Sequence, residues 1–245
     1  MENYIKNYES YNKSVVYNFN TGNGGIGDNI KFFMYILKLC MQANKRLYYK
    51  KNNIFIEEYI KLKYDIMYDD EDINKLDAEI VEPYMYYGTV DYDCVVDINE
   101  VFYFTDVVKI NKTYLFPHDI PYISIHLRLG DKYLETDVSY VHCTWDVREF
   151  SEKKIDEFIE KNSNENIFFC CDNESYKIKL KKKHNNIIIS NCDIGHSSLS
   201  NTTNKQVLDA ITEFYILTNS KLIFGASNSG FSIVASKFNN IPLIL

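Results

Sequence analysis

The sequence predicts an α/β protein with two Rossmann-like lobes, in which parallel sheets are flanked by helices. Residues 14–19 form a β-branched and aromatic run, and a glycine-rich loop joins this run to a helical apolar pattern at 29–43. The second half of the chain alternates apolar strands with helices, which is typical of parallel sheets with helices on both faces. The 245 residues, of which 46% are hydrophobic, are sufficient for two small domains with packed cores.

The first half is predicted to be the less regular lobe. Strands are expected at 14–19 and 47–49, and helices at 29–43 and 54–67, with an acidic loop at 69–72. Residues 78–118 stay ambiguous, because the short apolar runs at 93–98 and 107–110 fit either strands or irregular structure. We place the N-terminal lobe at 1–118 and the C-terminal lobe at 119–245.

The second half has a clearer order of elements. Strands are expected at 122–127, 167–171, 187–190, 222–224 and 241–245. Helices are expected at 152–161, 174–183, 205–218 and 229–237. Ser151 directly precedes the first of these helices and is its candidate N-cap. In such a lobe, ligands bind beyond the carboxyl ends of the strands.

Charge and composition exclude several functions. The net charge of −7 argues against non-specific binding of nucleic acid, which needs clustered cations. No apolar run approaches the roughly 18–20 residues of a membrane span. Residues 1–11 are polar and unlike a signal peptide, so we expect a cytoplasmic protein. The cysteines form no C-x-x-C pair and are interpreted as reduced thiols; a zinc site of His142, Cys143, Cys192 and His196 is the alternative.

The most informative stretch follows the strand predicted at 122–127. It delivers His126, Arg128, Asp131 and Lys132 onto one turn after an apolar run. Burying an arginine without a partner is costly, and its planar fork suits phosphate or carboxylate. We therefore expect a phosphate-bearing ligand, specifically a nucleotide sugar. The alternative is a surface arginine paired with Asp131.

The first glycine-rich loop contains Gly22, Gly24, Gly25 and Gly27, and Asp28 follows it. Its spacing fits neither G-x-G-x-x-G nor the ending of a P-loop. Backbone N–H groups at the start of the following helix would bind an anion or a substrate there. The alternative is a tight strand-to-helix turn without a ligand. Asp28 is then either a partner of the helix dipole or a catalytic base.

Two later strand ends also carry polar side chains. Asp172 follows the strand at 167–171 and is either a helix cap or a functional residue. Ser227, Asn228 and Ser229 place hydroxyl and amide groups at a helix start, which is typical of a phosphate cradle. Asp91-Tyr92-Asp93 matches the D-x-D pattern that holds a metal in some glycosyltransferases. With Arg128 and a helix N-terminus available for the diphosphate, metal is not required.

Taken in chain order, these motifs resemble the superfamily of α1,2-, α1,6- and protein-O-fucosyltransferases. Residues 24–27, Gly-Gly-Ile-Gly, resemble its G-G-[LI]-G opening, and residues 126–131 match its H-x-R-x-G-D signature. Residues 168–172 are similar to its later strand ending in Asp. Residues 208–217 and 222–232 are similar to its final helix, strand and serine-rich turn.

The resemblance implies a metal-independent, inverting glycosyltransferase of the GT-B type. It would transfer fucose from GDP-fucose to a glycan or another hydroxyl acceptor. Arg128 would bind the β-phosphate and stabilise the leaving GDP, and His126 and Asp209 would contact the nucleoside. Lys132 stands where the α1,6 enzymes carry a lysine near the diphosphate. The implied phosphate and donor contacts are Gly24, Gly25, Gly27, Asp172, Ser227, Asn228 and Ser229.

An inverting displacement also needs a carboxylate that takes the proton of the acceptor hydroxyl. The candidates are Asp28 and Glu135. We favour Asp28, because a loop from the opposite lobe can face the anomeric carbon from the acceptor side. The alternatives are a heptosyltransferase-like enzyme with another nucleotide sugar, and a catalytically degenerate module that binds a nucleotide sugar or glycan.

Overall fold

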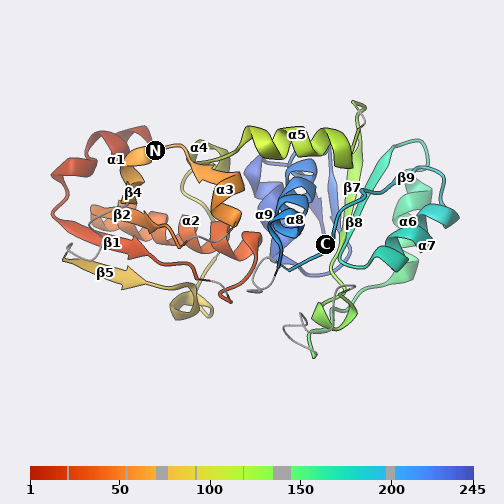
Figure 1. Cartoon of the computed structure of the whole chain (residues 1–245), viewed down its shortest axis with the longest axis horizontal. Helices are drawn as coiled ribbons and strands as arrows, with labels where there is room; N and C mark the ends of the chain where they lie inside the picture. The colour runs from red at the N-terminus through yellow and green to blue at the C-terminus, as the bar shows by residue number, and fades with distance from the viewer. Residues whose placement is uncertain are drawn as a thin grey trace.

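The computed structural model describes residues 1–20, 22–52, 55–69, 77–91, 93–117, 119–134, 145–196 and 202–245. Within these ranges the chain forms a four-stranded sheet, a five-stranded sheet and a two-stranded ribbon. Both larger sheets are parallel. They lie toward opposite ends of an elongated molecule with helices between and beside them (Figure 1). The predicted α/β class with parallel sheets is confirmed.

The four-stranded sheet belongs to the first half of the chain. Its order is β4-β2-β1-β5, with β1 at Lys13–Tyr17, β2 at Lys45–Lys50, β4 at Tyr68–Asp69 and β5 at Ala78–Val81. The helix between β1 and β2, α2 at Ile26–Ala43, buries a nearly continuous apolar face. It begins directly after the glycine-rich loop, so that loop lies at the carboxyl end of β1.

The five-stranded sheet belongs to the second half and has the order β11-β10-β7-β8-β9. Its strands are β7 at Ile123–Leu127, β8 at Ile167–Cys171, β9 at Ile187–Ile188, β10 at Ile223–Gly225 and β11 at Leu243–Ile244. Its helices are α6 at Glu152–Lys161, α7 at Glu174–Lys183, α8 at Asn204–Leu217 and α9 at Gly230–Phe238. All residues of β7 and β8 are buried.

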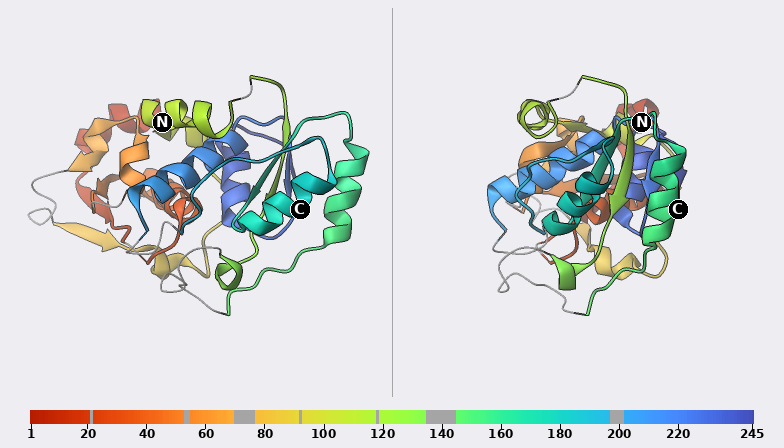
Figure 2. Two further views of the ribbon diagram at one scale, coloured as in Figure 1. Left: turned by 45° about the vertical axis from the view of Figure 1, so that its right-hand side comes forward. Right: turned by 90° about the vertical axis from the view of Figure 1, so that its right-hand side faces the viewer.

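Strand β8 shows why these runs are apolar on both faces. Phe168 and Cys170 pack into the core that contains α8 and α9, whereas Phe169 and Cys171 pack toward α6 and α7. Successive side chains of a strand point to opposite faces, so a central strand covered on both faces must be continuously apolar. Helix α6 lies at the end of the molecule farthest from β1 (Figures 1 and 2).

The two larger sheets are joined by a linking layer. It contains the antiparallel pair β3 (Ile60–Leu62) and β6 (Phe102–Phe104), and the short helices α3 at Ile56–Tyr59 and α4 at Ile98–Val101. Helix α5 at Asp106–Leu115 packs along α8. The ring of Phe104 contacts Phe214 at 6.1 Å and Phe238 at 4.8 Å between centroids. The apolar core is therefore continuous from the first sheet into α8 and α9.

Most elements predicted for the second half are confirmed to within a few residues. Some predictions for the first half are wrong. The helix predicted at 54–67 ends at Tyr59, and Ile60 begins strand β3. Ile60 and Leu62 are buried on either side of exposed Lys61, which is the alternation of a strand. Residues 107–110 are helical within α5.

Two further predictions concern boundaries and membranes. The lobe boundary at 118/119 stays a prediction; the two larger sheets fall on either side of it. Part of the acidic loop predicted at 69–72 lies outside the described residues. Across the ranges given above, no helix is long and apolar enough to cross a bilayer.

Candidate functional site

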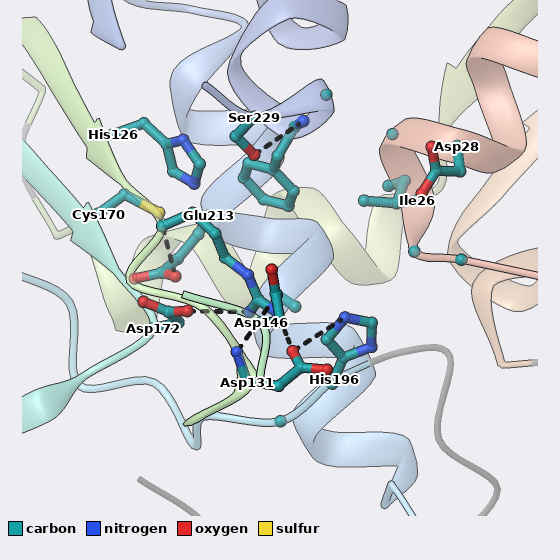
Figure 3. Close-up of a pocket in the computed structure, with 18 of the residues that line it drawn as sticks. Ile26, Asp28, His126, Asp131, Asp146, Cys170, Asp172, His196, Glu213 and Ser229 are labelled. Carbon is teal, nitrogen blue, oxygen red and sulfur yellow. Dashed lines mark hydrogen bonds and ion pairs between the residues drawn. The ribbon is translucent and has the colours of Figure 1, made fainter. Parts of the chain in front are cut away.

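A cavity of about 670 Å³ lies where the glycine-rich loop, the end of β7 and the start of α9 meet. Figure 3 shows side chains of both halves around it, with Asp28 on the opposite side from His126 and Asp172. Nine of the predicted site residues line this cavity: Gly24, Gly25, Gly27, Asp28, His126, Arg128, Asp172, Asn228 and Ser229. Lys132, Asp209 and Ser227 do not appear among its described lining residues. Glu135 lies outside the described residues.

Arg128 follows the last residue of β7, and its side chain is 17% exposed. Its guanidinium forms an ion pair with Asp131 and a second with Asp172, at 2.9 Å from Nη1 to Oδ2. Asp146 lies farther away, at 3.7 Å from Nη2. Arg128 does pair with Asp131, as the alternative required, but not at the surface, because the Asp131 side chain is only 4% exposed. The carboxylates hold the fork in one orientation at the cavity wall.

Asp172 organises the turn that carries Arg128. Its carboxylate accepts hydrogen bonds from the backbone N–H groups of Leu129, at 2.8 Å, and Gly130, at 3.1 Å. Burial raises the pKa of Asp172, and the charge of Arg128 opposes that shift. The capping alternative is wrong, because the Asn173 side chain accepts the N–H of Tyr176 at the start of α7. Asp172 is therefore positioned to orient Arg128.

Gly130 permits a close crossing of two chain segments beside Arg128. Its φ is +105°, a conformation that L side chains rarely adopt. A Cβ at this position would lie 2.3 Å from the carbonyl oxygen of Asp146. The backbone N–H of Lys132 donates to that oxygen at 3.3 Å, and the N–H of Arg148 donates to Leu129 O at 2.9 Å. The segment that begins at Trp145 is thus fixed against the turn.

His126 precedes Arg128 by two residues, points into the cavity and is only 5% exposed. Its ring stacks on Phe231 of α9 at 4.9 Å between centroids. Burial, and secondarily the charge of Arg128, lower the pKa of His126 to about 3, so the imidazole is neutral near pH 7. Among the described atoms its Nδ1 is buried without a hydrogen-bond partner. A buried polar atom without a partner is costly unless a ligand or water satisfies it.

The serine-rich turn divides into a structural and a cavity-lining part. Ser227 is buried, and its hydroxyl both accepts the N–H of Arg128 and donates to its carbonyl oxygen, each at 2.9 Å. Ser227 therefore joins the end of β7 to the turn after β10. Ser229 caps α9 by accepting the N–H of Phe231, at 3.3 Å. Asn228 and Ser229 line the cavity at this helix start.

The glycine-rich loop brings a second helix start to the same cavity. Helix α2 begins at Ile26, and a Cβ added to Gly27 would lie 2.9 Å from the backbone carbon of Gly230. The first turns of α2 and α9 are therefore in close backbone contact. Partial positive charge at two helix N-termini favours an anion between or beside them.

Asp28 lies in the first turn of α2, and its side chain is 32% exposed. Its carboxylate forms an ion pair with Lys31, at 2.9 Å. Asp28 and Lys31 both line the cavity from the N-terminal side. The carboxylate is therefore accessible from the cavity, as a group that takes a proton from a bound substrate requires.

Two predicted donor contacts lie elsewhere. Asp209 is fully buried in α8 and accepts hydrogen bonds from Lys205 Nζ, at 2.6 Å, and the backbone N–H of Asp193, at 2.8 Å. Its hydrogen-bond partner Asp193 lines the cavity. Lys132 is exposed, with its Nζ 5.7 Å from the ring centroid of Tyr133. Their predicted nucleoside and diphosphate contacts stay predictions.

Sequence reasoning missed a buried charged pair behind the cavity. Glu213 of α8 lines the cavity, and its Oε1 lies 3.6 Å from Nζ of Lys177, whose side chain is fully buried. Lys177 Nζ also donates to Ser190 O at 3.3 Å and to Cys192 Sγ at 3.1 Å. Burial would lower the pKa of Lys177, but Glu213 and Cys192 raise it. Both charges fit ordinary helix patterns, so only tertiary packing reveals the pair.

The D-x-D alternative lies outside the cavity, whereas the zinc alternative is described only in part, with Cys192 and His196 on the cavity wall. Asp91 forms an ion pair with Lys38 at 3.0 Å, and its Oδ1 accepts the N–H of Asp93. Neither aspartate appears among the described cavity residues. Of the alternative zinc ligands, His142 and Cys143 lie outside the described ranges.

No protein-family model and no curated protein matches the sequence. Solved structures do match the fold. A NodZ α-1,6-fucosyltransferase co-crystallised with GDP aligns with a TM-score of 0.60 and 10% identity, covering 91% of this chain and 92% of that one. The chain has the fold of fucosyltransferases. NodZ from Bradyrhizobium aligns at 0.55 and 11% identity, covering 94% and 96%, and POFUT1 in complex with GDP at 0.53 and 9%, covering 94% and 97%.

Proposed function

We propose that the protein is a metal-independent, inverting glycosyltransferase that transfers fucose from GDP-fucose to a hydroxyl group of a glycan. Residues 119–245 hold the donor, and residues 1–118 face the acceptor. The observation that carries the proposal is the oriented guanidinium of Arg128 in a cavity that also contains two helix starts. The NodZ and POFUT1 structures that share this fold contain GDP or GDP-fucose, which supports the choice of donor.

The leaving group determines the first requirement of the reaction. Breaking the bond between fucose and the β-phosphate develops negative charge on the phosphate oxygens. Donors that are already oriented stabilise this charge without reorganising. Arg128, the N–H groups at the start of α9 and the hydroxyl of Ser229 supply such donors. The cavity volume of about 670 Å³ lies within the usual range for small-molecule sites.

The acceptor determines the second requirement. Its hydroxyl oxygen attacks the anomeric carbon, and its proton passes to a carboxylate as the new bond forms. Asp28 is the proposed base, because it lines the cavity opposite Asp172 (Figure 3), the ion-pair partner of Arg128. Attack from that side, with departure of GDP toward Arg128, inverts the anomeric centre. Lys31 forms an ion pair with Asp28 and would hold its carboxylate at the cavity edge.

Ligand binding without added metal tests the donor. We would titrate GDP, GDP-fucose, GDP-mannose, UDP, ADP and ADP-heptose by calorimetry, in buffer containing a chelator. A ligand at 100 times its Kd adds about 2.7 kcal/mol to the free energy of unfolding, so thermal shifts provide a second readout. We expect GDP and GDP-fucose to bind selectively, and Arg128→Ala to weaken both.

Each other outcome would point to a different function. Preferential binding of ADP-heptose or UDP would overturn the fucose donor and favour the heptosyltransferase-like alternative. Binding of GDP-fucose without transfer or hydrolysis would favour the catalytically degenerate module. Binding that requires a divalent cation would overturn metal independence.

A further inference from the structure

The sequence contains a single tryptophan, Trp145, and the structure places it on the cavity wall. Its side chain is 83% exposed. Single exposed apolar side chains are common on protein surfaces. Trp145 differs from them because it lines the cavity that the proposed reaction uses. An indole in that place offers a large, rigid apolar face to a ligand.

The backbone next to Trp145 is held firmly beside Arg128. The carbonyl oxygen of Asp146 packs against the Cα of Gly130 and accepts a hydrogen bond from the N–H of Lys132. The Asp146 carboxylate accepts from Arg148 Nε at 2.8 Å and lies 3.7 Å from Arg128. The position of Trp145 is therefore coupled to the turn that holds the leaving group.

A second exposed aromatic ring lines the cavity from the N-terminal half. Tyr87 is 54% exposed, and its hydroxyl donates to the carbonyl oxygen of Asn23 at 3.0 Å. Its ring meets Phe32 edge-on at 5.0 Å between centroids. Nζ of Lys31, which pairs with Asp28, lies 5.9 Å from the centroid of the Tyr87 ring, so Tyr87 lies near the proposed base.

We propose that Trp145 and Tyr87 form the acceptor site and that the acceptor is an oligosaccharide, bound by stacking of its pyranose rings on these side chains. This inference rests on the proposed function. A pyranose ring has one face of C–H groups and a rim of hydroxyls, so it covers an aromatic face while its rim stays hydrogen-bonded. Trp145 lies on the Arg128 side and Tyr87 on the Asp28 side. A saccharide between them would present a hydroxyl to Asp28.

Binding of glycans is the first test. We would incubate the full chain with saturating GDP on a printed glycan array and titrate any bound glycan in solution. All tryptophan fluorescence arises from Trp145, so stacking is expected to shift and quench the emission. Tyr114→Ala is the matched control, because Tyr114 is 75% exposed on α5 and is absent from the described cavity lining. No bound glycan, despite bound GDP, would overturn the inference.

Kinetics is the second test. Trp145→Ala and Tyr87→Ala are each expected to raise the KM for the acceptor about tenfold or more, with the Kd for GDP unchanged. Trp145→Phe should restore the KM to within about threefold of wild type. An unchanged acceptor KM in Trp145→Ala would disprove the stacking site. Failure of the wild-type protein to bind GDP-fucose would instead disprove the proposed function.

Discussion

The two sides of the cavity share one local architecture but differ in the residues of the turn. Each begins with a buried parallel strand, continues through a turn and reaches the N-terminus of a helix or short helical turn. After β7, the turn is crowded: Arg128 has carboxylate partners, and Asp172 accepts two backbone N–H groups. After β1, the turn carries glycines at 22, 24 and 25; a Cβ on Gly22 would meet nothing within 4 Å, whereas one on Gly24 would lie 2.4 Å from Oδ2 of Asp28.

This difference suggests that the two sides have different roles in the transfer. A fixed cation is useful where charge develops in the same place during every reaction cycle. An open loop with one accessible carboxylate suits an acceptor that must enter and leave. The crowded side would then determine departure of the nucleotide, and the open side would determine attack. Variants on each side separate these two roles.

Asp28→Asn is expected to have the largest effect. Removing the base should lower kcat by about 10²–10⁴-fold, the usual contribution of general base catalysis. The Kd for GDP and the Tm should change little, because the Asp28 side chain is partly exposed and lies opposite the donor side. Single-turnover kinetics would measure the loss of rate, calorimetry the Kd for GDP and thermal unfolding the Tm. If Glu135→Gln shows this loss and Asp28→Asn does not, Glu135 is the base.

Arg128→Lys tests the crowded side. Lysine keeps the charge but cannot reproduce the planar fork that contacts Asp131 and Asp172. Loss of one such oriented donor is expected to cost about 2.7–4 kcal/mol of transition-state stabilisation, or about 10²–10³-fold in kcat. Wild-type turnover in this variant would contradict the assignment. Thermal unfolding distinguishes lost catalysis from lost folding, because Arg128 also neutralises buried carboxylates.

Gly27→Ala tests the contact between the two sides. The new Cβ would lie 2.9 Å from the backbone carbon of Gly230, which cannot rotate away as a side chain would. Such overpacking is expected to lower the free energy of unfolding by about 1–3 kcal/mol and to weaken GDP binding. Gly88→Ala is the matched control, since a Cβ there meets nothing within 4 Å. Equal effects of the two substitutions would disprove the close contact.

His126 predicts a pH dependence of stability. Its pKa is about 3 when folded and near the usual 6.5 of histidine when unfolded, so the unfolded state binds more protons between these values. The contribution of neutral His126 to the free energy of unfolding is therefore complete above about pH 6.5 and is lost as the pH falls toward 3. Between pH 5.5 and 4.5, wild type should lose about 1.4 kcal/mol more than His126→Gln. Denaturant unfolding at both pH values measures the difference, and parallel losses would mean that His126 is exposed.

The sequence predicted the charged residue of the cavity, Arg128, better than the residues that orient it or pack behind it. Arg128 was found because a charged fork after an apolar strand has no purpose in a core. The role of Asp172 stayed open, because Asp172 and Asn173 are both able to cap a helix and only geometry shows which one reaches Tyr176. Lys177 and Glu213 were missed because their contact depends on how α7 and α8 pack around β8.

The first half was harder to predict for a related reason. Residues 54–67 carry apolar side chains at spacings that fit a helix, and part of that segment becomes a strand only through pairing with β6. Strand pairs formed across forty residues leave no local signal in either partner. The glycine-rich loop and α2 were predictable, because turn residues and a long apolar period are both local.

Asp91→Asn is expected to have the smallest effect and tests the role of metal. Asp91 pairs with Lys38 on the surface, and exposed ion pairs of this kind contribute little. Transfer and Tm should stay within about twofold and about 1 °C of wild type, in chelator and in Mg²⁺ or Mn²⁺ alike. A loss of transfer that added Mn²⁺ partly restores would make the D-x-D motif a metal site. The diphosphate would then be neutralised from the open side as well, and the contrast between the two sides would no longer hold.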